Sequence, residues 1–227
     1  MTDLKAIAPG IAAALAATLA ATVAFGHGDM TPQAVDTRGL PAFGEDWLAE
    51  NPFRSAEGDL RETALEVGAQ GYNSNCARCH GLEVISGGLA PDLRYLEPSD
   101  WGDEWYVERF RRGYIQNGTT KMPSFDGLLS QEAAWAIRTY IETRPDLDQL
   151  DAIAGERQAL IDRLSASVGD AGALGAIADD LLALSASVDT AYGEGEADTP
   201  MTRAAALLKA RPDAAEKALA VLADGLD

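Results

Sequence analysis

The feature that most constrains this chain is a short motif, Cys76-Ala77-Arg78-Cys79-His80. Its two cysteines are the only ones in the sequence, and a histidine follows the second directly. Two thiols three positions apart can reach the two vinyl groups on one edge of a porphyrin, and the adjacent imidazole then lies beneath the iron. The spacing is that of c-type haem attachment. It predicts one covalent haem c, attached through Cys76 and Cys79, with His80 as an iron ligand.

Two other chemistries share part of this motif. A Cys-x-x-Cys pair alone would equally fit a thioredoxin-like redox site or a zinc site. A thioredoxin-like site needs a strand before the motif, but residues 61–75 have a helical pattern. A zinc site needs a second pair of ligands, and the only other histidine is His27, near the start of the chain. The sequence therefore favours haem over both alternatives.

A second axial ligand is expected from a methionine. Met122 precedes Pro123, which restricts it to extended conformations, in a loop rich in glycine and threonine. A thioether held in such a loop can point at the iron, so Met122 is the predicted ligand. Met30 and Met201 are expected to be structural. Ligation by His80 and Met122 raises the reduction potential relative to two histidines and fills both axial positions, which favours electron transfer over catalysis.

The first 26 residues have the pattern of an export signal. Lys5 precedes an apolar, alanine-rich run over residues 7–25, and small residues follow at Ala24 and Gly26. This layout is typical of a secretory signal peptide, here residues 1–26. The run is also close to the roughly 20 residues that span a bilayer, so an uncleaved anchor is the alternative. We expect cleavage and a soluble periplasmic protein without membrane insertion.

Between the signal and residue 146, the pattern predicts an arm and then helices. Residues 27–58 contain three prolines and several glycines, so they should wrap the surface, pinned by Trp47 and Phe53. The next helix should begin near Asp59, with Glu57 or Asp59 as its cap. The helices expected in this part of the chain cover residues 59–75, 100–113 and 130–143.

The composition changes after Pro145. In residues 146–227 the aromatic residues are reduced to Tyr192, while Ala, Leu and Asp dominate at helical spacing. Turns are expected at 169–175 and 193–199, and Pro212 suits the first turn of a last helix. We therefore expect an acidic, Ala/Leu-rich helical extension, packed as a bundle on itself or on the preceding domain. A helical repeat array is the alternative, but no regular period supports it.

The charge of the chain limits its partners. It carries 36 acidic residues against 18 Lys and Arg, a net charge of -18. Residues 27–145 contribute 19 acids and 11 bases, and residues 146–227 contribute 16 and 6. Phosphate backbones and anionic lipids would be repelled, so no nucleic acid partner is expected. A protein with a basic patch would be attracted, unless the acids only solvate the helix faces.

These features together resemble a class I cytochrome c. The chain has a helix running into the haem motif, a loop with Pro91, then Met122-Pro123-x-Phe125 and a closing helix. The resemblance implies an all-α fold, with the cytochrome c domain at residues 59–145 followed by the helical extension. It also implies that the first and closing helices cross at a glycine and an aromatic residue. The residues suited to this crossing are Gly68, Tyr72, Trp135 and Tyr140.

The same resemblance implies roles around the haem. The Pro91 carbonyl would accept the second ring proton of His80, which fixes the imidazole tautomer. Asn117 and Gly118 would lead the chain into the methionine loop. Residues that could contact a haem propionate are Trp105, Arg109 and Tyr114, although Arg109 could equally belong to a solvated helix face.

A narrower likeness covers residues 40–144. This stretch, including Gly44-Glu45-Asp46-Trp47-Leu48 and the residues around the haem motif, resembles the PedF-type soluble cytochromes c of quinoprotein alcohol oxidation systems. The likeness implies that a PQQ-dependent alcohol dehydrogenase donates electrons and that a terminal oxidase or another cytochrome accepts them. A general periplasmic carrier for another dehydrogenase, a haem peroxidase-type enzyme, and an interaction role for the extension are the alternatives.

Overall fold

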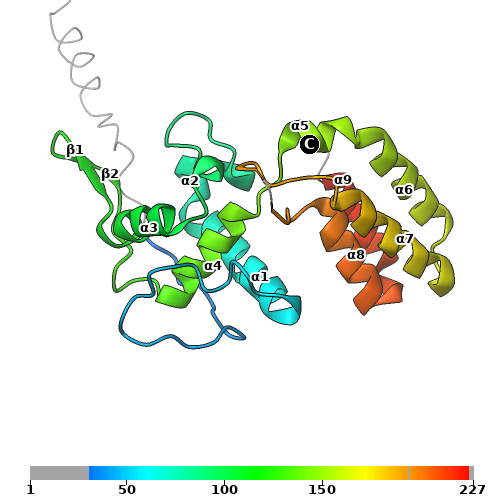
Figure 1. The fold of residues 1–227 in the computed structure, drawn as a ribbon, viewed down its shortest axis with the longest axis horizontal. Helices are drawn as coiled ribbons and strands as arrows, with labels where there is room; N and C mark the ends of the chain where they lie inside the picture. Colours follow the sequence, from blue (N-terminus) through cyan, green and yellow to red (C-terminus); the bar gives the residue numbers. More distant parts are fainter. Residues whose placement is uncertain (1–30, 194, 225–227) are drawn as a thin grey trace, which may run out of the picture.

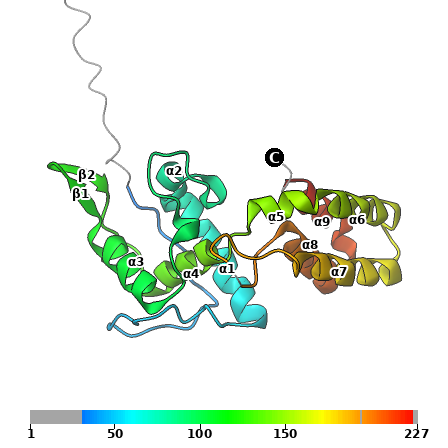
Figure 2. The same ribbon diagram turned by 45° about the horizontal axis from the view of Figure 1, so that its top comes forward.

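The structure is a computed structural model that describes residues 31–193 and 195–224. The predicted signal peptide, residues 1–26, and both His27 and Met30 lie outside the described residues. Figures 1 and 2 show two lobes side by side, an N-terminal lobe with helices α1 to α4 and a C-terminal lobe with helices α5 to α9. The predicted all-α fold with a helical C-terminal extension is confirmed.

The N-terminal lobe contains four α-helices, two 3-10 turns and one small hairpin. Glu57 occupies the N-cap position of the first helix, but within the described chain its side chain makes no capping hydrogen bond, so that part of the capping prediction is wrong. Asp59 lies in the first turn instead. The elements are α1 (Gly58–Asn75), α2 (Ala77–His80), η1 (Leu82–Val84), η2 (Leu93–Tyr95), α3 (Asp100–Arg112), β1 (Tyr114–Gln116), β2 (Thr119–Met122) and α4 (Gln131–Glu142).

Helices α1 and α4 cross at a point where only glycine fits. A Cβ on Gly68 would lie 2.1 Å from the carbonyl oxygen of Ala136, so the two backbones touch. Next to this contact the rings of Tyr72 and Tyr140 pack with their centroids 5.4 Å apart. The predicted pairing of Gly68 and Tyr72 with Tyr140 is therefore present. Trp135 lies elsewhere, with its ring 6.3 Å from that of Tyr106 on α3.

Charged side chains are buried between α3, α4 and the arm. Asp103 and Arg138 have fully buried side chains and pair at 3.0 Å. Arg138 also pairs with Glu142 at 2.9 Å, and Arg54 of the arm contacts both carboxylates at 2.7 Å. Because every charge in this network has an opposite charge beside it, the ions can be buried without an uncompensated desolvation cost.

The arm, residues 31–57, is held by its backbone as well as by its apolar side chains. The backbone NH of Phe43 donates to Glu132 and that of Leu48 donates to Gln131, each at 2.6 Å. Phe53 is 1% exposed, and Trp47 packs at the edge of the same core. These contacts place the arm over the N-terminal end of α4, as the predicted pinning by Trp47 and Phe53 requires.

The C-terminal lobe has its own apolar core. Helices α6 to α9 contact one another in a ring, in which α6 packs on α7 and α9, and α8 packs on α7 and α9. Met201 is fully buried in this core, consistent with the structural role predicted for it. The elements are α5 (Leu147–Ala152), α6 (Ala154–Ala166), α7 (Ala171–Ser185), α8 (Pro200–Ala210), η3 (Pro212–Ala214) and α9 (Ala215–Asp224).

Two boundaries in this lobe differ from the sequence predictions. The turn predicted for residues 169–175 ends at Asp170, whose side chain accepts hydrogen bonds from the amides of Gly172 and Ala173 and thereby starts α7. Gly172 and Gly175 lie inside the helix. The predicted helix before that turn is divided at Ile153 into α5 and α6. Among the described residues, no helix combines the length and apolar character needed to cross a membrane.

Candidate haem site

The haem motif lies at the join between α1 and α2. Cys76 ends the first helix and begins the second, with its amide donating to the Tyr72 carbonyl at 2.7 Å. The amide of His80 donates to the Cys76 carbonyl at 3.0 Å. One helical turn therefore carries both thiols and the imidazole, and residues three apart on a turn share a face. Both cysteines are free and only partly buried, so their sulfur atoms remain available for covalent attachment.

His80 is oriented by the loop that follows the motif. Its Nδ1 lies 2.8 Å from the Pro91 carbonyl oxygen. A carbonyl only accepts, so this contact requires the proton on Nδ1 and leaves the Nε2 lone pair for a metal. Burial lowers the pKa of His80, outweighing the opposing effects of Pro91 and Asp92. Burial therefore favours the neutral imidazole, and the hydrogen bond to Pro91 selects the tautomer whose Nε2 can bind iron.

The Pro91 carbonyl is held in place by short contacts on both sides. Ser86 donates its hydroxyl to the Ala90 carbonyl and accepts the Gly88 amide. On the other side, Asp92 caps the 3-10 turn η2 and forms an ion pair with Arg94 at 2.7 Å. These contacts order the loop, so the hydrogen bond to His80 is part of a braced segment.

A glycine directly after the motif is required by the fold. Gly81 has φ = 85°, and a Cβ there would lie 1.8 Å from the carbonyl oxygen of Ile85. Its carbonyl accepts the Tyr72 hydroxyl at 2.8 Å. Gly81 is a residue of the site that the sequence patterns did not predict, although its position directly after His80 was a visible signal. Together, Gly81 and Tyr72 set the direction in which the chain leaves the haem motif.

The thiol of Cys76 is protonated in this environment. Burial, with a smaller contribution from Cys79, raises the pKa of Cys76 to about 12. A neutral thiol avoids the desolvation cost of a buried thiolate. Cys76 is therefore neutral where it packs against the apolar core.

Met122 lies at the end of strand β2, which corrects the prediction of an irregular loop. It pairs with Tyr114 in a hairpin whose turn residues, Asn117 and Gly118, both have positive φ. Such a turn matches the twist of paired strands, and an Asn-Gly pair is its commonest sequence. Met122 is half-buried and packs on the same core as Cys76. The hairpin thus carries the predicted second ligand to the core on which Cys76 also packs.

The three candidate propionate contacts form one cluster. The guanidinium of Arg109 lies 5.5 Å from the Trp105 ring centroid and 5.1 Å from that of Tyr114. Arg109 is therefore held between two rings rather than on a freely solvated helix face. Since Tyr114 pairs with Met122, the cluster places a cation next to the strand that carries the predicted ligand.

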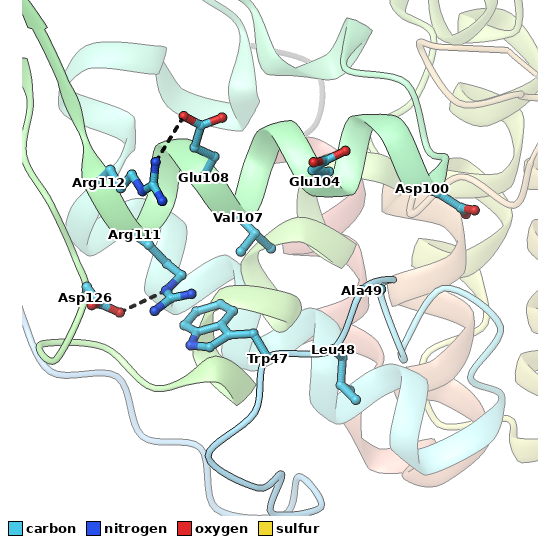
Figure 3. Close-up of a pocket in the computed structure, with 10 residues that line it drawn as sticks. All are labelled: Trp47, Leu48, Ala49, Asp100, Glu104, Val107, Glu108, Arg111, Arg112 and Asp126. Carbon is cyan, nitrogen blue, oxygen red and sulfur yellow. Dashed lines mark hydrogen bonds and ion pairs between the residues drawn. The ribbon is translucent and has the colours of Figure 1, made fainter.

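A separate open groove lies between the arm and α3 (Figure 3). It has a volume of about 710 Å³ and contains no residue of the predicted haem site. Trp47 lies under Arg111, which pairs with Asp126, and Arg112 pairs with Glu108 (Figure 3). Both arginines of the groove thus have a carboxylate partner there, and the groove lies apart from the predicted haem site.

The residues present fit a covalently attached haem. Two free thiols and an imidazole with Nε2 directed away from its partner lie on one helical turn, and the hydrogen-bonded proton on Nδ1 fixes the tautomer. His80 and Met122 would hold the iron, and Cys76 and Cys79 would form the thioether bonds. Across the described chain, no group of three or more potential His, Cys, Asp or Glu ligands that could hold a separate metal ion is found.

Comparisons with known proteins agree with this chemistry. The family model described as cytochrome c oxidase, cbb3-type, subunit III matches residues 63–141. The chain is 53% identical over 123 residues to cytochrome c550 of Pseudomonas aeruginosa, covering 53% of this chain and 83% of that protein. It is 30% identical to cytochrome c6 of Euglena gracilis over 79 residues, which are 34% of this chain and 88% of that protein.

A third similarity is confined to part of a much longer protein. Quinohemoprotein alcohol dehydrogenase ADH IIB of Pseudomonas putida is 38% identical over 80 residues, or 35% of this chain, but the match covers only 11% of that protein. No solved structure matches the chain.

Proposed function

Because the chain belongs to the cytochrome c family, whose members carry covalently attached haem c, we propose that it is a monohaem electron carrier with Cys76 and Cys79 as attachment residues and His80 and Met122 as iron ligands. When bound, the haem iron supplies a one-electron couple. With both axial positions filled by the protein, substrate has no place at the iron, so the role is electron transfer rather than catalysis.

The observation that best supports this proposal is the 2.8 Å contact between His80 Nδ1 and the Pro91 carbonyl. It fixes the proton on the nitrogen away from the iron and raises the basicity of the ligand, as partners beyond the ligands of metal-bound histidines generally do. Met122, from the hairpin on the other side of the domain core, would complete the coordination.

We further propose a PQQ-dependent alcohol dehydrogenase as the electron donor and a terminal oxidase or another cytochrome as the acceptor, in the periplasm. The partial similarity to a quinohemoprotein alcohol dehydrogenase supports this donor class, because it joins a related haem domain to such an enzyme in one chain. A net charge of -18 would steer the carrier toward a basic docking site. A general carrier for another dehydrogenase is the second candidate, since the similarity to the cytochromes c550 and c6 specifies no donor.

Substitution of Met122 tests the axial ligand. Met122→Ala should keep covalent haem, lower the reduction potential and open the iron to external ligands such as imidazole or azide. Met201→Ala, which removes a fully buried methionine from the other lobe, is the control and should leave the haem spectrum unchanged. A Met122→Ala variant with the wild-type ligand spectrum would show that another residue ligates the iron.

The attachment residues and the donor need separate experiments. Cys76→Ser should reduce the yield of holoprotein because one thioether bond is lost; a normal yield would contradict the attachment site.

For the donor, stopped-flow reduction by a PQQ-dependent alcohol dehydrogenase and its alcohol should be fast and should slow as salt is added. Slow reduction at every salt concentration would exclude this donor while leaving the haem assignment intact.

A further inference from the structure

The end of α4 carries a buried cation that belongs to neither lobe alone. Arg144 is 1% exposed, donates from Nε to the Tyr140 carbonyl at 2.9 Å, and lies 3.8 Å from the centroid of the Tyr140 ring. Its two terminal nitrogens point to different lobes. Nη1 donates to Glu83, at 2.8 Å, and Nη2 donates to Asp198 of the C-terminal lobe. One guanidinium therefore bridges the two lobes.

Glu83 lies in the loop that begins directly after the haem motif. Glu83 has φ = 51° and Val84 has φ = 66°, so two consecutive residues other than glycine adopt left-handed backbone conformations. For a β-branched residue such as Val84 this conformation is a steric outlier, and it persists only where the surroundings enforce it. The Glu83 carboxylate receives the Arg144 guanidinium and the Tyr140 hydroxyl, and these contacts can supply that constraint.

Asp198 is held equally firmly on the opposite side of Arg144. Its amide donates to the Thr143 carbonyl at 2.8 Å, and its side chain, 9% exposed, also pairs with Arg203 at 3.0 Å. Close by, Pro145 and Thr190 form a β-bridge, and the Ala191 amide donates to the Arg144 carbonyl. The extension is thus attached to the N-terminal lobe by backbone hydrogen bonds as well as by ion pairs.

The charges explain why the junction should act as a unit. Arg144 needs a carboxylate partner because an isolated buried cation is costly. Glu83 cannot fill that role alone, since its side chain is 55% exposed and water weakens the attraction between the two charges. Asp198 is the partner that is buried with Arg144. It keeps the guanidinium in place, and the guanidinium in turn holds Glu83.

We propose that the C-terminal extension is a structural part of the haem site: Asp198, acting through Arg144, holds the Glu83–Val84 loop that follows His80. Arg144 and Asp198 are positioning residues, because neither is assigned a contact with the haem. The consequence for haem chemistry rests on the proposed function, whereas the coupling between the extension and the loop does not.

The test uses the full-length holoprotein and reads the loop directly. Amide hydrogen exchange is measured at Gly81 and Ile85, whose amides donate to the Ala77 and Leu82 carbonyls. Asp198→Asn should accelerate exchange at these amides at least about tenfold, because a hydrogen bond to a charged group typically contributes a tenfold or larger factor. Asp180→Asn is the matched control, since it removes a half-exposed Arg–Asp pair elsewhere in the same lobe and should leave the loop unchanged.

Further variants separate positioning from a direct charge effect. Glu83→Gln and Arg144→Met should accelerate exchange in the loop as Asp198→Asn does, and all three should make the haem environment more variable in spectra. If loop exchange is unchanged in Asp198→Asn, the proposal is wrong. Reduction potentials that shift in opposite directions in Asp198→Asn and Arg144→Met, with normal exchange in both, would likewise overturn it in favour of charge alone. A wild-type chain without covalent haem would contradict the proposed function, and the loop comparison would still decide this proposal.

Discussion

The two lobes are both helical, but they are stabilised in different ways. The N-terminal lobe combines stacked aromatic rings with buried ions, such as Asp103 and Arg138. The C-terminal lobe has a core of Leu, Ile, Ala, Val and one Met, and its Arg163–Asp180 pair is half-exposed. The first lobe must hold a flat cofactor at a set of oriented groups, which calls for directional contacts. The second lobe folds around nondirectional apolar packing, and its directional contacts with the first lobe are concentrated at the Arg144–Asp198 junction.

The largest expected effect is on the unfolding free energy, when one paired arginine is replaced in each lobe in turn. Arg138→Met leaves Asp103 and Glu142 buried with only Arg54 beside them, so unfolding free energy should fall by about 3–5 kcal/mol. Arg163→Met removes a half-exposed pair and should change it by less than about 1 kcal/mol. Urea unfolding, followed by the far-UV signal, measures both. Similar losses in the two variants would show that the lobes do not differ in this way.

Two glycine-to-alanine substitutions, one in each lobe, are expected to change the stability of the protein in opposite directions. Gly68→Ala places a Cβ against the Ala136 carbonyl and should cost about 1–3 kcal/mol, because two touching helices must separate. Gly175→Ala meets nothing within 4 Å on an exposed face of α7 and should stabilise the protein by about 0.5–1 kcal/mol. Thermal unfolding should move the midpoint down in the first variant and up in the second. A neutral Gly68→Ala would mean that the helix crossing is looser than the structure shows.

The smallest expected effect is on how steeply the unfolding free energy falls at acid pH. Burial would by itself raise the pKa of Asp198, but the attraction of Arg144 and Arg203 outweighs it and lowers the pKa below its ordinary value. A lowered pKa means that the ionised carboxylate stabilises the fold above about pH 4 and that this stabilisation is lost as pH falls through the folded-state pKa. In Asp198→Asn this component should be absent. Unfolding free energy followed from pH 6 to pH 3 should therefore fall less steeply in the variant than in the wild type.

Local sequence patterns predicted much of this architecture. Helices were predicted over residues 100–113 and 130–143, close to the observed bounds of α3 and α4, and the haem motif is recognisable from two cysteines and a histidine at fixed spacing. The hairpin was missed, although Asn117-Gly118 is a strong turn signal, because its strands are short and exposed. The sequence did not reveal the ionic junction either. Which carboxylate meets Arg144 is decided by the three-dimensional approach of residues far apart in the chain, and no local pattern records it.

The return of the extension to the haem loop sets an order of events during synthesis. The thiols, the imidazole and the Pro91 carbonyl all leave the ribosome before Asp198, because Pro91, the last of them, precedes Asp198 by 107 positions. None of the groups proposed to attach or ligate the haem lies in the extension. Asp198, the buried partner of Arg144, follows later in the chain, just before α8. The groups that would attach the haem are therefore far apart in sequence from the carboxylate that holds the loop behind them.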